Sequence, residues 1–328
     1  MNAHKITRFS NFNSIKMIIT GLMVIGLFGC ASTPISLQPA ITSANPFKKQ
    51  LISTSGVPLT IDADDIETSR KLPKMTADEY ERLGDALLQK GNLSIAYLQY
   101  ERSLQRNPGN IRVEYKKGFA LLVGKKYSSA VKQFEAVLKK KPDYIAAYEG
   151  LGRAYFCKNN YVGAEKYLRR AVDMDPKLWE AHNYLGNIYD SQNRYETAIR
   201  EYQSAISVNP KAGFVYNNLG VSHSMAGQYR QAVEAFRKAI ESKYATPKVF
   251  NNLGIALSNL EKYNEAFEAF RKGGTEAQAY NNLGVVYLSH AKFKQASDCF
   301  EKAIKIDPKF YTIANENLKK ARMNSSQL

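Results

Sequence analysis

Small and hydrophobic residues recur at a fixed spacing along this chain from about residue 77 onward. A glycine, preceded by leucine in six of seven cases, marks each recurrence, and an alanine stands twelve residues after each glycine. The glycines are Gly84, Gly118, Gly152, Gly186, Gly220, Gly254 and Gly284. They lie 34 residues apart, except that the last interval is 30 residues. Such a period predicts about seven similar structural repeats over residues 77–310.

Each repeat is long enough for two helices joined by short turns. Apolar residues spaced three and four apart predict one amphipathic helix around the glycine and a second around the alanine. Glycine inside a helix costs about 1 kcal/mol relative to alanine, so its recurrence predicts a close approach of the second helix. In five repeats a proline stands twenty-four residues after the glycine, where a helix must end. The pattern therefore predicts an all-α fold.

Two stretches depart from this regularity. The segment FRKGGTEAQAYNNLG in the sixth repeat is four residues short, and two glycines, Gly273 and Gly274, stand where its second helix should end. A shortened second helix is predicted there. Residues 311–322 (YTIANENLKKAR) follow the last repeat with an amphipathic pattern, which predicts a helix that covers the terminal apolar face of the array.

The 34-residue period, with its leucine-glycine, alanine and proline columns, resembles the tetratricopeptide repeat family. The resemblance implies a solenoid of antiparallel helix hairpins over residues 76–322, with about seven repeats and the capping helix, and a tail over residues 323–328. A capping-box pattern at Thr76 and Glu79 marks the expected start of the first helix. In this family the first helix of each repeat lines an inner groove through repeat positions 2, 5, 6, 9 and 12.

The N-terminal residues predict a targeting segment. Lys5, Arg8 and Lys16 precede the apolar run MIITGLMVIGLF, which is too short to span a membrane as a helix but suits a signal peptide. The sequence Leu-Phe-Gly-Cys at residues 27–30 resembles the lipobox of bacterial lipoproteins. That resemblance implies a signal peptide over residues 1–29 and acylation of Cys30. An uncleaved membrane anchor and an ordinary secretory signal are the alternatives.

Residues 30–75 predict a flexible linker, because they are rich in serine, threonine and proline and show no sustained hydrophobic period. A lipidated Cys30 supplies the several acyl chains that stable membrane anchoring requires. Ala31 follows the cysteine, where aspartate is the usual inner-membrane retention signal. The lipoprotein resemblance therefore implies attachment to the periplasmic face of the outer membrane.

No catalytic or metal-binding pattern occurs in the sequence. Three cysteines, Cys30, Cys157 and Cys299, are too few for a disulfide scaffold. There is no His-Glu-x-x-His motif, no paired-cysteine metal motif and no phosphate-binding glycine loop after a strand. We therefore expect no enzymatic activity, cofactor, metal ion or small-molecule substrate.

Asparagines occupy the expected inner groove. The sequence YNNLG, or once FNNLG, places paired asparagines at repeat positions 5 and 6. An amide side chain both donates and accepts hydrogen bonds, so a row of them can hold the backbone of an extended peptide, as in some members of the family. The candidate groove residues are Asn183, Asn218, Asn252, Asn282, Arg112 and Arg153. The alternative is that these asparagines belong to the repeat pattern and hydrogen-bond their own neighbours.

The basic residues suggest further partners. The sequence carries a formal net charge of +16, and residues 111–144 hold nine basic residues against three acidic ones. In a periplasmic setting such a surface suits anionic lipid, peptidoglycan or an acidic protein. A solvated helix face is the plainer interpretation. Nucleic acid is not expected, because no recognition module accompanies the charge.

The expected lipid anchor, linker and repeat array together resemble the small repeat lipoproteins of pilus and secretion systems. Residues 214–320 are most similar to the Flp or tight-adherence (Tad) pilus assembly lipoprotein. This resemblance implies a protein–protein interaction scaffold with a pilotin-like role toward an outer-membrane secretin. A periplasmic scaffold for peptidoglycan hydrolases or other cell-envelope factors is the alternative. An enzyme or a nucleic-acid-binding protein is the rival from another class.

Overall fold

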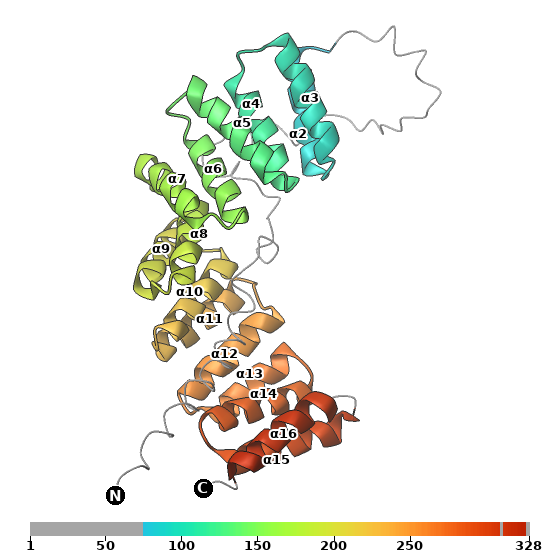
Figure 1. Cartoon of the computed structure of the whole chain (residues 1–328), viewed down its shortest axis with the longest axis vertical. Helices are drawn as coiled ribbons and strands as arrows, with labels where there is room; N and C mark the ends of the chain where they lie inside the picture. Colours follow the sequence, from blue (N-terminus) through green and yellow to red (C-terminus); the bar gives the residue numbers. More distant parts are fainter. Residues whose placement is uncertain (1–74, 309–310, 326–328) are drawn as a thin grey trace, which may run out of the picture. The chain divides into compact units, whose positions relative to one another are not determined.

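A computed structural model of the protein describes residues 75–308 and 311–325. The expected signal peptide, Cys30 and most of the linker lie outside the described residues. The described residues form fifteen helices and no strand, which confirms the predicted all-α class (Figure 1). Within these ranges, no helix combines the length and apolar character needed to cross a membrane. The helices fall into two compact units, an N-terminal unit that ends at Pro176 and a C-terminal unit that begins at Lys177.

The N-terminal unit contains three hairpins, each made of an A helix followed by a B helix. The A helices are α2 (Ala77–Gln89), α4 (Ile111–Val123) and α6 (Ile145–Cys157), and the B helices are α3 (Leu93–Arg106), α5 (Tyr127–Lys140) and α7 (Tyr161–Met174). The predicted capping box starts α2. The Thr76 backbone N–H donates to Glu79 Oε2 at 2.7 Å, and Thr76 Oγ1 accepts from the Glu79 N–H at 3.3 Å.

The C-terminal unit contains four further hairpins and the capping helix. Its A helices are α8 (Trp179–Ser191), α10 (Gly213–Met225), α12 (Pro247–Asn259) and α14 (Glu276–Ser289). Its B helices are α9 (Tyr195–Val208), α11 (Tyr229–Glu241), α13 (Tyr263–Gly273) and α15 (Phe293–Ile306), and α16 (Tyr311–Ser325) follows them. The two units together hold the seven predicted repeats.

The irregular sixth repeat has the predicted short B helix. Helix α13 has 11 residues, whereas the other B helices of this unit have 13 or 14. Gly274 ends it in an extended conformation, and a capping box formed by Thr275 and Gln278 starts α14 immediately afterwards. Pro247 occupies the first turn of α12. A proline fits there because the backbone N–H groups of the first turn have no acceptor within the helix.

The core of each hairpin is a large side chain of the B helix that lies on the glycine of the A helix. A Cβ atom added to Gly220 would lie 2.6 Å from the ring of Phe236, which is fully buried. The same pairing joins Gly84 to Tyr100, Gly118 to Phe134, Gly186 to Tyr202, Gly254 to Phe270 and Gly284 to Phe300, while Gly152 faces Leu168. The recurring glycine therefore provides the space in which this side chain packs.

This contact differs from the one that the sequence predicted. The pattern predicted that the B helix itself passes too close to the glycine for a Cβ atom. In six hairpins the nearest atoms belong to an aromatic ring, and only Gly152 also has a backbone atom of the B helix, the Leu168 nitrogen, among its nearest neighbours. The recurring alanines of the B helices, such as Ala232 and Ala266, are fully buried. The small residues thus accommodate a ring as well as a neighbouring helix.

Helix α16 covers the last hairpin, as predicted. Its side chains Ala314, Leu318 and Ala321 are buried. Leu318 and Ala321 pack in one cluster with Ala296 and Phe300 of α15. The apolar face of the final repeat is thereby removed from water, which a repeat array needs at each end.

We expect Gly220→Ala to destabilise the C-terminal unit, although alanine is the better helix former. The added methyl group overlaps the buried Phe236 ring, and overpacking of a dense core costs about 1–3 kcal/mol. Urea unfolding followed by circular dichroism measures the loss. Gly109→Ala is the control, because nothing lies within 4 Å of a Cβ atom at that position. Equal unfolding midpoints for the two variants would contradict the ring-on-glycine contact.

Candidate protein-binding surface

Asparagine side chains connect the successive A helices of the C-terminal unit. Four hydrogen bonds run from an Nδ2 donor to the Oδ1 acceptor of the preceding A helix. They join Asn218 to Asn183 at 3.2 Å, Asn252 to Asn217 at 3.2 Å, Asn282 to Asn251 at 3.4 Å and, from α16, Asn317 to Asn281 at 3.1 Å. The amides of repeat positions 5 and 6 therefore link each repeat to the next.

The four predicted groove asparagines are not equally accessible. Asn183 and Asn252 are each 3% exposed, so their amides lie beneath the surface. Asn218 and Asn282 are partly exposed and can reach a bound chain. Hydrogen bonds between neighbours, the alternative interpretation, account for part of what these amides do. Contact with a peptide stays a prediction.

Charged side chains take the same positions in the N-terminal unit. Arg112 Nη2 donates to Glu81 Oε2 at 2.7 Å, and Lys116 Nζ donates to Glu81 Oε1 and to Asp85 Oδ2 at 2.6 Å each. Burial alone would raise the pKa of the Glu81 carboxyl, but hydrogen bonds from Arg112 and Lys116 outweigh burial and hold that pKa below its usual range. This network joins α2 to α4 by charge.

The second predicted groove arginine also has an acidic neighbour within its own unit. Arg153 Nη1 lies 3.9 Å from Glu149 Oε1, one helical turn away on α6. Its guanidinium group lies 5.6 Å from the centre of the Phe119 ring. Arg112 and Arg153 therefore both contribute to the packing of the N-terminal unit, and a partner's carboxylate would compete with these contacts.

Acidic side chains of the N-terminal unit neutralise part of the positive charge of the second repeat. Besides Arg112 and Lys116, Lys117 Nζ lies 3.2 Å from Glu101, and Lys140 pairs with Glu114. The remaining bases of residues 111–144 are exposed: Lys125, Lys126, Lys132, Lys139 and Lys141. The charge available to an outside partner is therefore smaller than the composition indicates.

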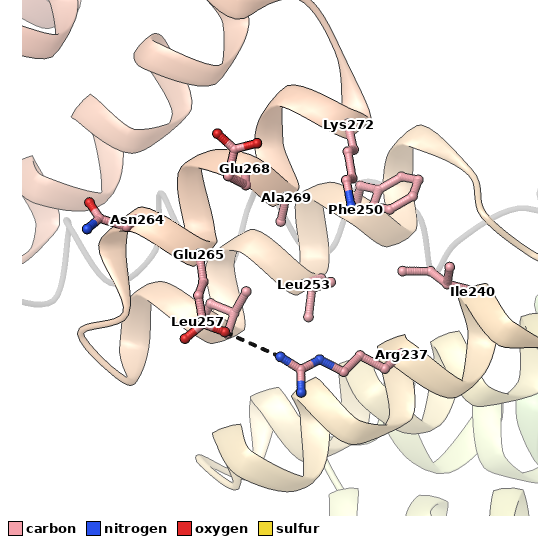
Figure 2. A pocket seen from close by; sticks show the side chains of 10 residues that line it. All are labelled: Arg237, Ile240, Phe250, Leu253, Leu257, Asn264, Glu265, Glu268, Ala269 and Lys272. Carbon is pink, nitrogen blue, oxygen red and sulfur yellow. Dashed lines mark hydrogen bonds and ion pairs between the residues drawn. The ribbon is translucent and has the colours of Figure 1, made fainter.

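A cavity of about 540 Å³ lies among α11, α12 and α13 (Figure 2). Leu253 and Leu257 of α12 contribute apolar lining, and Arg237 Nη2 donates to Glu265 Oε2 at 3.3 Å at its edge. An apolar lining with a charged edge suits an aliphatic or aromatic side chain of another protein. The sequence contains no signal for the cavity, because leucine also stands at the position of Leu257 in the first two repeats, at Leu87 and Leu121.

The described residues also show what chemistry the surface lacks. Over residues 75–308 and 311–325, no three His, Cys, Asp or Glu side chains gather in a way that could hold a metal ion. Cys299 is a free thiol, and burial raises its pKa to about 11. The thiolate that a nucleophilic cysteine needs is therefore scarce at neutral pH.

Protein-family models identify the same helical repeats in the sequence. Tetratricopeptide repeat models match residues 115–178, 167–200, 186–227, 215–243, 248–273 and 277–310, which together cover more than half of the chain. The chain belongs to the tetratricopeptide repeat family. Repeats of this family act as protein–protein interaction scaffolds.

Solved structures with TM-scores above 0.5 share the fold of this chain. A repeat protein from Parabacteroides merdae is 18% identical, with a TM-score of 0.51 over 75% of this chain and 98% of that one. The Cut9–Hcn1 hetero-tetramer of the APC/C gives a TM-score of 0.51 at 20% identity over 78% of this chain and 50% of that one. MamA is 25% identical over 48% of this chain and 91% of its own, with a TM-score of 0.45. No curated protein sequence matches significantly.

This tetratricopeptide repeat protein contains polar groups that the sequence reasoning missed. One is Lys248 of α12, a half-buried base in the A-helix row. Another is Asp190 at the end of α8, which is 5% exposed. Ser222 Oγ donates to both Asp190 carboxylate oxygens, at 2.7 and 2.8 Å, and Tyr202 Oη donates to Oδ2 at 2.9 Å. The period assigned Asp190 to groove position 12 but gave no sign of its burial.

We expect Asp190 to make the C-terminal unit less stable as pH rises. Burial raises the pKa of this carboxyl to about 7, although hydrogen bonds from Ser222 and Tyr202 oppose the shift. Because the unfolded chain ionises at its ordinary, lower pKa, stability falls between about pH 4 and pH 7, by up to a few kcal/mol, and then levels off. Asp190→Asn should flatten this dependence in urea unfolding measured across that range.

The matched control for Asp190→Asn is Glu234→Gln, which removes an exposed carboxyl of α11 from the same unit. It should leave the pH profile close to that of the unaltered protein. If Asp190→Asn and the unaltered protein show parallel profiles from pH 4 to pH 8, the buried carboxyl does not govern this stability.

Proposed function

We propose that this tetratricopeptide repeat protein is a lipoprotein of the outer membrane, exposed to the periplasm, whose repeats bind another protein during assembly of a pilus or secretion machine. The observation that carries the proposal is the presence on one chain of the Leu-Phe-Gly-Cys sequence at residues 27–30 and a scaffold of seven repeats. The scaffold role follows from the family. The anchor and the machine are inferred from sequence resemblance.

The anchor explains the arrangement of the chain. An acylated Cys30 would hold the protein at the membrane, and the linker predicted for residues 31–74, roughly 44 residues if flexible, would have a root-mean-square reach of roughly 35–40 Å. The repeats could then meet a partner at some distance from the bilayer. A tether of this kind also raises the local concentration of the repeats near membrane-embedded partners.

A secretin of the Flp or Tad type is the partner that the resemblance of residues 214–320 favours. Helices α10, α12 and α14 of that segment present partly exposed amides and apolar side chains rather than a charged surface. Such a surface suits a segment of polypeptide. A pilotin-like role would consist of binding secretin subunits and helping them localise or oligomerise at the outer membrane.

A scaffold for peptidoglycan hydrolases or other envelope factors is the second candidate. The exposed lysines of the second repeat favour it, because they could contact the carboxylates of the cell wall. The internal pairing of Arg112, Lys116, Lys117 and Lys140 reduces that charge. We therefore place the pilus or secretion role first.

Cys30→Ser should abolish membrane anchoring. The serine side chain cannot take the thioether-linked lipid, so labelling with radioactive palmitate should disappear and the protein should leave the outer-membrane fraction. Cys299→Ser is the control and should keep its label, because that thiol is buried in the repeat core. Recovery of the unaltered protein with an unmodified Cys30, as read by mass spectrometry, would refute the anchor.

Deletion of the gene should lower the amount of assembled secretin. Immunoblots of unheated membranes report secretin multimers, and we expect a loss of several-fold that the unaltered gene restores. A Cys30→Ser copy should restore less, since its product is not held at the membrane. Multimers at the normal level in the deletion strain would count against the pilotin-like role and leave the hydrolase scaffold as the better candidate.

A further inference from the structure

The turns that join the A and B helices of the N-terminal unit lie along one edge of that unit. A Cβ atom added to Gly124, in the second turn, would lie 3.7 Å from Leu93 Cδ1 at the start of α3. Tyr127, at the start of α5, packs in one cluster with Ala154 and Tyr155 of α6, which lead into the third turn. The three turns are therefore neighbours, and the side chains that point outward from them share one surface.

Lysines dominate the charge of these turns. The basic edge consists of residues 90–95 (KGNLSI), 124–129 (GKKYSS) and 158–163 (KNNYVG), which hold equivalent places in three successive repeats. It contains no acidic residue, and its four lysines are all exposed: Lys90, Lys125, Lys126 and Lys158. In the described part of this unit, ion pairs engage other lysines, namely Lys116, Lys117 and Lys140. The positive charge of the basic edge is therefore directed outward.

The equivalent turns of the C-terminal unit have a different charge pattern. They are residues 192–197, 226–231, 260–265 and 290–295. These turns carry Glu196, Glu261 and Glu265 as well as bases. Some of the charges pair, since Lys262 Nζ lies 2.9 Å from Glu265 Oε1 and Lys292 Nζ lies 4.0 Å from Glu261 Oε1. A run of lysines without acids thus distinguishes the N-terminal unit and is not a property of every repeat.

Exposed aliphatic side chains lie among the lysines of the basic edge. Ile95 is 51% exposed and Val162 is 81% exposed, and Leu98 is 43% exposed one helical turn beyond Ile95. At the places of Ile95 and Leu98, all other repeats carry glycine, polar or charged residues: Ser129 and Lys132, Gly163 and Lys166, Thr197 and Arg200, Gln231 and Glu234, Glu265 and Glu268, Gln295 and Asp298. In the described part of the chain, the other large exposed aliphatic side chains lie at the ends of α9 and α15 or on α16.

Lysines interspersed with exposed aliphatic side chains suit the surface of an anionic bilayer. The ammonium groups are attracted to lipid phosphates, and the aliphatic groups leave water at the boundary between headgroups and acyl chains. The long lysine side chain keeps its charge among the headgroups while its aliphatic neighbours go deeper. The bacterial cell wall is also anionic, but it has no apolar layer in which Ile95 and Val162 could be buried. The combination therefore favours lipid.

We infer that the basic edge of the N-terminal unit binds the surface of a bilayer that contains anionic phospholipid. Its lysines contact the lipid phosphates, and Ile95 and Val162 enter the headgroup boundary. This contact goes beyond the proposed function, because it is additional to the anchor at Cys30 and needs no acyl chain. It uses turns and the starts of B helices, so the A helices remain accessible to a protein partner.

Tryptophan reporters in the full-length protein test this contact. Trp179 is the only tryptophan of the chain, and Trp179→Phe keeps an aromatic ring against Phe214. In that background, Val162→Trp places a reporter on the basic edge, and Arg230→Trp places one at the equivalent position two repeats later. Each protein is reconstituted into vesicles of phosphatidylcholine and phosphatidylglycerol in which the phosphatidylglycerol has brominated acyl chains. Bromine quenches the fluorescence of a tryptophan that it contacts.

The Val162→Trp reporter should lose about half of its emission in these vesicles, because an interfacial apolar side chain reaches the acyl boundary. Arg230→Trp should keep its emission. The loss should be small in vesicles of brominated phosphatidylcholine alone, and also in about 1 M NaCl, where the Debye length is about 3 Å. Equal quenching of the two reporters, quenching that is the same without the anionic lipid, or no quenching would overturn the proposal.

Charge reversal tests the lysines themselves. Lys125→Glu together with Lys126→Glu should restore most of the emission of the Val162→Trp reporter. Lys211→Glu together with Lys243→Glu is the matched control, because both lysines are exposed in the C-terminal unit and Lys243 has a φ of 63°, close to the 57° of Lys125. If circular dichroism shows that the reversal costs helix, Lys125→Gln with Lys126→Gln replaces it. Quenching that survives both pairs of substitutions would contradict a role for these lysines.

Co-sedimentation with purified peptidoglycan sacculi distinguishes the other anionic surface. If reversal at Lys125 and Lys126 lowers binding to sacculi while the quenching by lipid is unchanged, the basic edge contacts the cell wall and the membrane contact fails. If the reversal lowers the quenching and leaves binding to sacculi unchanged, the membrane contact is supported.

These outcomes are separable from the proposed function. Quenching of the Val162→Trp reporter, with Cys30 found unmodified in cells, would support the contact at the basic edge and refute the anchor. An acylated Cys30 without that quenching would refute the contact and leave the anchor standing. The amount of assembled secretin in the deletion strain bears on the pilotin-like role alone.

Discussion

Each hairpin of this protein depends on a large side chain that packs directly on a glycine. Six of the seven side chains are aromatic rings, and burial of one ring stabilises the fold by about 3 kcal/mol. The ring can occupy that place only because the A helix lacks a Cβ atom there. The cost of a glycine within a helix is small in comparison, which explains why the residue recurs in every repeat. Helix spacing, and hence the position of every inward side chain, follows from this contact.

A constant spacing allows the same positions to carry different chemistry in the two units. In the N-terminal unit, positions 2, 5, 6 and 9 hold an ion network that is satisfied internally. In the C-terminal unit, the corresponding positions hold amides, a valine and Lys248. The first arrangement stabilises its own hairpins. The second leaves amide side chains such as Asn218 and Asn282 partly exposed.

The sequence predicted the fold well because its information is periodic. The seven hairpins, the short α13, the capping box at Thr76 and the capping helix all followed from spacing. The side-chain partners were predicted less well, since periodicity assigns a residue to a face but does not say which neighbour it contacts. Arg112 and Arg153 were assigned to the groove without their acids Glu81 and Glu149, and Lys248 was overlooked. A comparison of equivalent positions across repeats would have found Lys248, because it lacks the acid that Arg112 has.

The asparagine hydrogen bonds have a consequence for the length of the array. Asn252 donates to the amide of the preceding repeat, and Asn282 does the same one repeat further on. Since each of these repeats has a donor at position 6 and an acceptor at position 5, one of the three repeats with paired asparagines could be duplicated or lost without leaving a polar group unpaired. The Arg112–Glu81 junction has no such freedom, because its two sides are chemically different. The number of C-terminal repeats with paired asparagines could therefore change during evolution, whereas the order of the first two repeats is fixed by the Arg112–Glu81 pair.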